Sequence, residues 1–539
     1  MSDYARKNLH GNYNITILEK NKEVKHISCP AGSNLLEAMR ENNMNIVSTC
    51  AGRGFCGKCK IRLLFGTLEV TSEDERFFTK TQLTQGLRLA CRAYPTDNCV
   101  IEIIDYEADF EVVTDYLPEI DAMKLTENMH TKNKAEDKDY AIAIDIGTTT
   151  VVISLVNICS GKIINTYSAV NPQRAYGADV ISRICAANNG KQKLLQELIR
   201  SELLRGIYDL VEKSGIDKVN ICKLAIACNT TMGHLLLGFS CEGLGSYPYI
   251  PVDISAIERP FSYVFDSDYI DAPVIIMPGI STFVGGDIAA GPLACGFDKS
   301  DKPSLFLDLG TNGEMALGNR DRILVTSSAA GPAFEGGNIS CGVGSIAGAI
   351  CNVDIIDDKT YYRTIGDKEA VGICGTGIIE LTSELLDAGI IDETGLLIDK
   401  YFNEGFPIDV CLNNYNDIFY FTQKDIRQLQ MAKAAIRAGI DILIKEYGIS
   451  YDDLDKVYIA GGFGLKLNLH KAVNIGLLPK KLYDKIIPVG NSALRGAISY
   501  LIEPDAPVRI ESIVKAAVEL QLSEQEEFND LYLEYMYFR

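Results

Sequence analysis

The chain has 539 residues, of which 47% are hydrophobic and 23% are charged, as in globular proteins with several apolar cores. Its 52 Lys and Arg against 72 Asp and Glu leave a net charge of 52 − 72 = −20, which disfavours binding to nucleic acid or to acidic membranes. The first residues are polar and lack the apolar segment of a signal peptide, and no run of about 18 apolar residues follows. We therefore expect a cytoplasmic protein of several domains, with no nucleic-acid or membrane partner.

The first hundred residues predict one small domain of strands around a single helix. Alternating apolar and polar residues predict strands at residues 13–19, 23–29, 60–64 and 98–104. A helix is predicted at residues 33–42, with Ser33 as its N-cap. The order strand, strand, helix, cysteine-rich loop, strand is that of a β-grasp ferredoxin.

The loop at residues 50–59 reads CAGRGFCGKC and is the clearest candidate metal site. Its spacing C-x5-C-x2-C comes from Cys50, Cys56 and Cys59, and Cys91 follows thirty-two positions later. Four thiolates on a glycine-rich loop suit a [2Fe–2S] cluster, because glycine lets backbone amides approach the sulfides. Zinc ligands usually come as two CxxC pairs, whereas the fourth cysteine here stands alone.

Cys99 is a rival fourth ligand, but it falls within an alternating strand, where we expect it to pack as a small apolar residue. The loop spacing and the segment LRLACRA around Cys91 resemble the adrenodoxin-type [2Fe–2S] ferredoxins. The next segment, residues 105–138, is acidic and has no sustained period, so it is predicted to be a linker. Two interpretations of this linker stay open: a plain tether, or one that lets the cluster domain move between an electron donor and an acceptor.

A three-stranded hairpin pattern then occurs twice. Strands are predicted at residues 140–146, 150–157 and 162–168, and the pattern returns from residue 304 in SLFLDLGTNGEMALGNRDRILVTSS. Asp145 and Asp308 hold matching positions 163 residues apart, which indicates an internal duplication.

Each first strand ends in an Asp-x-Gly-Thr turn whose chemistry suits a phosphate group. The aspartate can hold Mg²⁺ through water, the glycine permits close approach, and hydroxyls and amides can contact phosphate oxygens. A lone turn of this kind is weak evidence, since Asp-Gly turns join many hairpins, but two copies facing each other would form a phosphate clamp. The candidate residues are Asp145, Gly147, Thr148 and Thr149 in the first copy and Asp308, Gly310, Thr311 and Asn312 in the second.

Three further glycine-rich segments follow buried strands. VYIAGGFGLKLN (457–468) contains Gly461, Gly462 and Gly464, which would let the backbone lie flat against adenine and ribose, although a tight strand–helix turn explains these glycines equally well. GICGTGIIELTSELLDAG (372–389) leads from Gly375 and Thr376 into an amphipathic helix, and these two residues are candidate nucleotide contacts. VGGDIAAG (284–291), after the strand VIIMP, is another glycine loop and a candidate lining of the same cleft. Residues 422–448 predict a long half-buried helix.

The motifs DIGTTT, DLGTNGE and AGGFG resemble the two phosphate motifs and the adenosine motif of the actin, sugar-kinase and Hsp70 superfamily. This resemblance implies a duplicated RNase-H-like fold that binds Mg-ATP between its halves. The expected fold class is α+β and α/β multidomain. The expected domains are a β-grasp [2Fe–2S] ferredoxin domain at residues 1–104, an acidic linker at 105–138, a first half with the middle region at 139–300, and a second half with the ATP motifs at 301–539.

A ferredoxin domain fused to such an ATPase resembles the reductive activators of corrinoid proteins. Beyond the motifs above, NPQRAYGADVISRI, CNTTMGHLLLG and AGPAFEGGNISCG carry the resemblance. It implies an ATP-hydrolysing protein that passes an electron from its cluster to a Co(II) corrinoid and so restores Co(I). The implied partners are the corrinoid protein of a methyltransferase system and a low-potential electron donor, and a homodimer is a further candidate. Alternatives are a redox-sensing nucleotide-binding regulator and a small-molecule kinase with a redox switch.

Overall fold

The computed structural model describes residues 11–18, 24–42, 59–78, 80–104, 139–310, 312–356, 359–408 and 419–538, with the single residues Met44, Ile46, Gly52, Gly54 and Gly57. The predicted linker at residues 105–138 and the candidate site residues Cys50, Cys56 and Thr311 lie outside this part. The chain forms two compact units: Met1–Ala108 with Pro172–Lys191, and Asp109–Asn171 with Gln192–Arg539. Within the described ranges, no helix combines the length and the apolar character needed to cross a bilayer.

The first unit contains a five-stranded sheet with the order β2-β1-β5-β3-β4. Its strands are β1 (Asn12–Leu18), β2 (Val24–Pro30), β3 (Lys60–Phe65), β4 (Leu87–Leu89) and β5 (Cys99–Ile103). β1 pairs antiparallel with β2 and parallel with β5, and β3 pairs antiparallel with β5 and β4. The helix α2 (Leu35–Glu41) buries its apolar side chains in the same core as β1 and β5. This mixed sheet with one packed helix confirms the predicted β-grasp fold.

The start of α2 differs from the prediction by one residue. The N-cap is Asn34 rather than Ser33, because Asn34 has extended backbone angles and its side-chain Oδ1 accepts a hydrogen bond of 2.9 Å from the N–H of Glu37. Asn34 therefore satisfies an amide of the first turn that has no partner within the helix.

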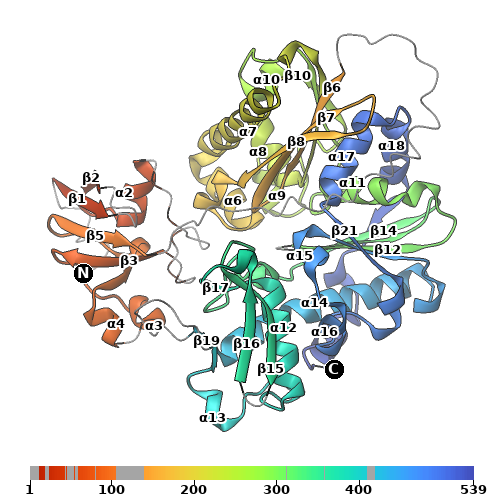
Figure 1. Ribbon diagram of the computed structural model, residues 1–539. Helices are drawn as coiled ribbons and strands as arrows, with labels where there is room; N and C mark the ends of the chain where they lie inside the picture. Colours follow the sequence, from red (N-terminus) through yellow and green to blue (C-terminus); the bar gives the residue numbers. More distant parts are fainter. Residues whose placement is uncertain are drawn as a thin grey trace. The chain divides into compact units, whose positions relative to one another are not determined.

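The second unit contains two six-stranded sheets, β10-β11-β9-β6-β7-β8 and β21-β20-β12-β13-β14-β22 (Figure 1). The first sheet contains β6 (Tyr140–Ile146), β7 (Thr150–Asn157), β8 (Ile163–Val170), β9 (Ile221–Cys228), β10 (Ile257–Pro260) and β11 (Pro273–Ile276). The second contains β12 (Ser304–Leu309), β13 (Gly313–Gly318), β14 (Ile323–Ser328), β20 (Val457–Ala460), β21 (Ile486–Gly490) and β22 (Ala517–Glu519).

The two sheets repeat one topology, which confirms the predicted duplication. In each, a three-stranded antiparallel hairpin is followed by two strands parallel to its first strand. Asp145 lies opposite Ala227 of the neighbouring parallel strand, and Asp308 lies opposite Ala460. The two aspartates therefore occupy equivalent positions near the carboxyl ends of β6 and β12.

Two helices join the halves of the second unit. They are α11 (Gly286–Cys295) and α17 (Ser492–Ile502), and Gly496 lets them cross closely, since a Cβ there would lie 2.3 Å from the carbonyl oxygen of Ala290. One apolar core contains residues of these helices together with Ala143 of β6 and Phe306 of β12. The boundary expected at residue 300 stays a prediction, and this core continues across it.

The second half also carries a small sheet and three helices that matter for the site. The small sheet has the order β16-β15-β17, made of β16 (Lys359–Thr364), β15 (Ala349–Ile356) and β17 (Gly372–Ile373). The helices are α12 (Gly375–Asp387), α15 (Gly461–Lys466) and α16 (Leu469–Asn474). The predicted long helix is α14 (Gln423–Tyr447), with Thr422 and Asp425 forming a capping box and Gly448 ending it in the left-handed region.

The end of the chain packs on α14 through a buried lysine. The Nζ of Lys433 donates hydrogen bonds to the carbonyl oxygens of Tyr535 (2.5 Å) and Tyr537 (2.7 Å), just beyond α19 (Phe528–Glu534). Lys433 has no exposed surface, and burial together with the nearby charge of Arg437 lowers its pKa to about 7.

This lysine predicts a pH dependence of stability. In the unfolded chain a lysine holds its proton until about pH 10.4, whereas the folded chain releases it near pH 7, so the unfolded state binds more protons between these values. The contribution of Lys433 to the free energy of unfolding should therefore rise with pH, by about 1–2 kcal/mol from pH 7 to pH 8.5 relative to Lys433→Met. Denaturant unfolding of both proteins at several pH values measures this difference. A difference that stays constant with pH would contradict it.

Candidate functional site

Four carboxylates of the second unit gather where the two hairpins and α11 meet. Asp145 and Asp308 come from the ends of β6 and β12, Asp287 from the first turn of α11, and Glu314 from β13. Burial raises the pKa of Asp145, Asp287 and Asp308 to about 7, and burial also raises the pKa of Glu314 well above its usual value.

The mutual repulsion of these groups shows that they are close in space. Asp308 adds to the raised pKa of Asp145, Asp145 adds to that of Asp287, and Asp287 adds to that of Asp308. Each of these side chains keeps part of its surface accessible to solvent. Partly accessible carboxylates that repel one another form a site where a cation or a cation-bound phosphate is stabilised.

Asparagines orient several of these groups. The Nδ2 of Asn491, the N-cap of α17, donates a 2.8 Å hydrogen bond to Oδ2 of Asp145. The Nδ2 of Asn229, the N-cap of α8 (Thr230–Leu237), donates to Oγ1 of Thr148 at 3.1 Å. In the second hairpin, Asn312 donates to Oε1 of Glu314 at 3.0 Å.

Besides the bond from Asn491 to Asp145, a hydrogen bond from the first predicted phosphate turn links the two halves. The Oγ1 of Thr149, in the first turn, donates to Oε2 of Glu335 at 3.2 Å, and Glu335 in turn adds to the raised pKa of Asp308. The structure thus brings the first and second predicted phosphate turns into one site.

The predicted adenosine segment lies next to the second turn. Gly461 has a φ of 85°, which favours glycine, and a Cβ there would lie 3.4 Å from Oδ1 of Asp308. A Cβ on Gly462 would meet nothing within 4 Å, whereas one on Gly464 would lie 2.4 Å from Cγ2 of Ile459. Gly462 therefore borders open space, and Gly464 packs against the strand that precedes it.

The start of α12 is also close to this segment. A Cβ on Gly375 would collide with the carbonyl oxygen of Phe334, and the ring of Phe334 packs on that of Phe463 with 5.2 Å between centroids. Thr376 is buried, and its Oγ1 lies 3.1 Å from Sγ of Cys374. The first turn of α12 and α15 therefore meet through two phenylalanines.

Sequence reasoning missed five polar residues of this site: Asn229, Asp287, Glu314, Glu335 and Asn491. Asp287 lies in VGGDIAAG, the glycine-rich segment that the sequence offered as a lining of the cleft without a role for its aspartate. The sequence did carry one signal for Asp287, which directly follows two glycines at the end of an apolar stretch. No local signal marks the asparagines, which reach the site as helix N-caps.

Two of the four predicted cluster ligands, Cys59 and Cys91, lie in the described part of the chain. Among the described residues, no three His, Cys, Asp or Glu side chains are grouped so that they could hold a metal ion. Cys59 and Cys91 are both buried, and the N–H of Ala90 donates to the carbonyl oxygen of Cys59 at 2.8 Å. A Cβ on Gly52 would lie 3.8 Å from Cβ of Cys91, so the loop passes beside this cysteine.

Cys99 lies in a different environment. It is buried in β5, where burial raises its pKa to about 11, and a Cβ on Gly66 would lie 2.7 Å from its own Cβ. Of these two buried cysteines, Cys91 lies beside Gly52 of the cysteine-rich loop, whereas Cys99 packs against Gly66.

Three family models match the chain in succession. They are described as the 2Fe-2S iron-sulfur cluster binding domain (residues 18–96), the RACo middle region (residues 140–300) and the C-terminal domain of RACo, the ASKHA domain (residues 302–539).

Two curated relatives and one solved structure are similar over most of the chain. The corrinoid activation enzyme RamQ of Eubacterium limosum is 34% identical over 425 residues, which cover 74% of this chain and 70% of the relative. The [Co(II) methylated amine-specific corrinoid protein] reductase of Methanosarcina barkeri is 28% identical over 434 residues, which cover 73% of this chain and 76% of the relative. A structure described as a reductive activator for corrinoid, iron-sulfur protein has 30% identity and a TM-score of 0.68, with 98% of each chain covered.

Proposed function

The chain belongs to the reductive activators of corrinoid proteins, and from this premise we propose that it restores the Co(I) state of a corrinoid protein that has been oxidised to Co(II), in a reaction that consumes ATP. The electron comes from a [2Fe–2S] cluster in the N-terminal domain, which a low-potential donor reduces again. We place the protein in the cytoplasm, with a homodimer as the candidate assembly. The corrinoid protein of a methyltransferase system is its partner.

The observation that carries this proposal is the joining of two kinds of site in one chain. The first unit has the β-grasp fold of an electron carrier, and the second brings two Asp-Gly turns together as an ATPase does. An electron carrier alone needs no nucleotide, and an ATPase alone needs no cluster. Their fusion supports an electron transfer that must be driven.

The energetics of cobalt explain the need for such a drive. Plant-type clusters lie near about −400 mV, above the potential usually associated with the Co(II)/Co(I) couple. For one electron, each step of about 59 mV uphill lowers the equilibrium ratio tenfold. ATP binding or hydrolysis must therefore change the complex so that the potential of cobalt rises or the reduced form is trapped. The direct test is the visible spectrum of a Co(II) corrinoid protein, followed anaerobically with and without Mg-ATP.

In the second unit, Asp145 and Asp308 suit a Mg²⁺ held through water, because both carboxylates are partly accessible and end equivalent strands. Bound Mg-ATP supplies the free energy of phosphate cleavage. Thr148 and Thr149 are placed to contact phosphate oxygens on one side and Asn312 on the other. Asp287, in the first turn of α11 and near Asp145, is our further candidate carboxylate for holding the cation or its water.

In the first unit, Cys50, Cys56, Cys59 and Cys91 are the proposed cluster ligands. The bound cluster supplies a one-electron carrier. Gly52 and Gly54 have φ values of 90° and 83°, so the loop adopts a backbone that favours glycine, and both residues lie against the segment Cys91–Arg92.

The ligand assignment predicts opposite results for two buried cysteines. The wild-type protein, purified anaerobically, should hold about two irons and two sulfides. Cys91→Ala should lose or destabilise the cluster, because it removes a thiolate, whereas Cys99→Ala should keep it. Iron analysis and the EPR signal of the reduced protein measure both. An essential Cys99 with a dispensable Cys91 would show that the assignment is wrong.

A further inference from the structure

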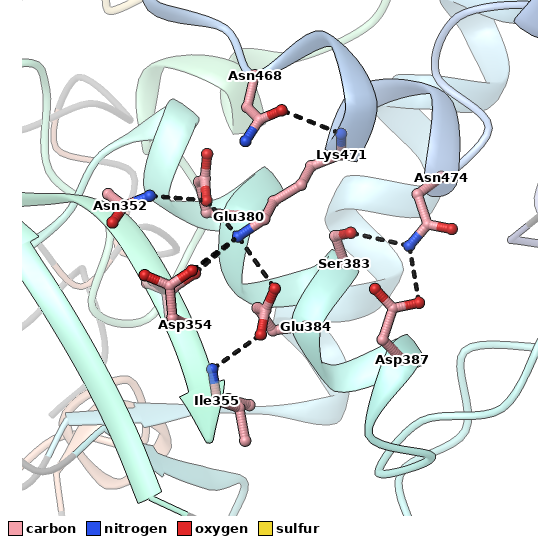
Figure 2. Close-up of polar contacts among 11 residues, drawn as sticks. Asn352, Asp354, Ile355, Glu380, Ser383, Glu384, Asp387, Asn468, Lys471 and Asn474 are labelled. Carbon is pink, nitrogen blue, oxygen red and sulfur yellow. Dashed lines mark hydrogen bonds and ion pairs between the residues drawn. The ribbon is translucent and has the colours of Figure 1, made fainter.

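The helices α12 and α16 contact each other through polar side chains (Figure 2). Glu380, Ser383, Glu384 and Asp387 lie three or four positions apart and so form one face of α12. Their partners on α16 include Lys471 and Asn474, which are also three positions apart. The contact between these two helices therefore includes directed polar interactions, which constrain how the helices are placed.

Lys471 is the centre of this contact. Its Nζ lies 2.5 Å from Oε2 of Glu380, 3.1 Å from Oε1 of Glu384 and 3.7 Å from Oδ1 of Asp354 in β15. It also donates to the carbonyl oxygen of Val353 at 2.8 Å. Burial acts against the charge, but the hydrogen bonds to Glu380 and Glu384 outweigh it and raise the pKa of Lys471. The ammonium group is therefore retained at neutral pH.

The carboxylates around Lys471 are held from their other sides. Asn352 donates to Oε2 of Glu380 at 3.1 Å, and the N–H of Ile355 donates to Oε2 of Glu384 at 2.8 Å. One ammonium thus connects α16, α12 and β15. Its removal would leave three carboxylates close together with no cation among the contacts drawn in Figure 2. Two of them, Glu380 and Glu384, are largely buried, and buried charges that lose their partner are strongly unfavourable.

Both helices lead directly into segments that we assign to the nucleotide. Glu380 lies in the second turn of α12, behind Gly375 and Thr376 at its start. Lys471 lies in the first turn of α16, and only Leu467 and Asn468 separate α16 from α15. Phe334 lies between the two segments, because its carbonyl oxygen lies against Gly375 of α12 and its ring packs on that of Phe463 in α15. Lys471 therefore connects α12, which begins at Gly375, with α16, which directly follows the glycine-rich helix α15.

We propose that Lys471 is a positioning residue of the nucleotide site, which sets the spacing between the first turn of α12 and α15 and thereby the affinity for the adenosine part of ATP. This inference rests on the proposed ATP-binding function. The partners of Lys471 lie on α12 and β15 and not in the phosphate turns. Loss of Lys471 should therefore weaken ATP binding more than it slows ATP hydrolysis.

The test compares full-length, cluster-loaded wild type with Lys471→Met and Lys471→Arg. For Lys471→Met, we expect the KM and the Kd for Mg-ATP to rise by about tenfold or more, with kcat within about twofold of wild type. Arginine keeps the charge and several donors, so Lys471→Arg should recover most of the affinity. Titration calorimetry gives the Kd, and phosphate release gives KM and kcat.

Arg509→Met is the matched control. Arg509 lies on α18 (Ala506–Ala516) and is a similarly buried cation, with its Nε 2.6 Å from Oδ2 of Asp298. Arg509→Met should lower the melting temperature while leaving the KM for ATP within about twofold. Glu384→Gln, a milder change in the same contact, replaces Lys471→Met if that variant does not fold. An unchanged KM in the folded variant, or an equal rise of KM in Arg509→Met, would overturn the inference. Wild type that fails to bind ATP would overturn the proposed function instead.

Discussion

Replacing Asp145 or Asp308 with alanine is expected to lower the rate of ATP hydrolysis by on the order of 100-fold or more, as for the loss of one group that stabilises charge in a transition state. The two carboxylates end equivalent strands, and Asp308 lies close enough to raise the pKa of Asp145. Removing either leaves the bound cation with one carboxylate fewer and unbalances the clamp. Phosphate release under anaerobic conditions measures the rate.

Three controls show whether the loss of ATP hydrolysis is specific to the two aspartates. The visible spectrum of the cluster should stay that of wild type, because the cysteines belong to the first unit and the aspartates to the second. Asp452→Ala removes an exposed carboxylate and should leave turnover unchanged. Asp308→Asn keeps the shape and loses only the charge, so it should be as inactive as the alanine variant. Undiminished turnover in both alanine variants would contradict the clamp.

A corrinoid protein in the Co(II) state is expected to become Co(I) only when a reductant, this protein and Mg-ATP are all present. Cys59→Ser should abolish the reduction but keep ATP hydrolysis, since it changes only the cluster. Asp308→Ala should show the converse, a reducible cluster that does not deliver its electron to cobalt. Without ATP, the yield of Co(I) should fall by at least about tenfold, which corresponds to about 59 mV for one electron.

The donor in this assay must be no stronger than the cluster, because a stronger reductant could reach cobalt without help. An equal yield of Co(I) with and without nucleotide would then refute the coupling to ATP. In that case intact nucleotide affinity without turnover would favour the redox-sensing regulator, in which the nucleotide only controls partner binding.

Local patterns were sufficient to predict the hairpins and the long helix. The strands β6 and β7 are neighbours in sequence and pair with each other. The apolar pattern and the Asp-x-Gly turn were therefore sufficient to predict this hairpin. The helix α14 likewise begins at a capping box and ends at Gly448, both of which are local signals. The repeat of Asp145 at Asp308 predicted the duplication because equivalent strands use the same turn.

The N-cap of α2 shows the limit of such patterns. Ser33 and Asn34 are neighbours and both cap helices well, so sequence alone does not separate them. The backbone angles of Asn34 decided the matter, and these depend on how the chain leaves β2. In the same way, VGGDIAAG carried a visible aspartate, but only the fold placed Asp287 beside Asp145.

The sequence by itself determined the chemistry available to this protein: a cysteine-rich loop, two Asp-Gly turns and the glycine-rich segments that follow buried strands. Only the tertiary structure decided which groups meet. Asn491 reaches Asp145 across 346 residues, and Lys471 reaches Glu380 across 91. The raised pKa of each clustered aspartate likewise comes from burial and from charges far away in sequence. Contacts and desolvation of this kind depend on the topology of the whole unit, and no local pattern of residues encodes them.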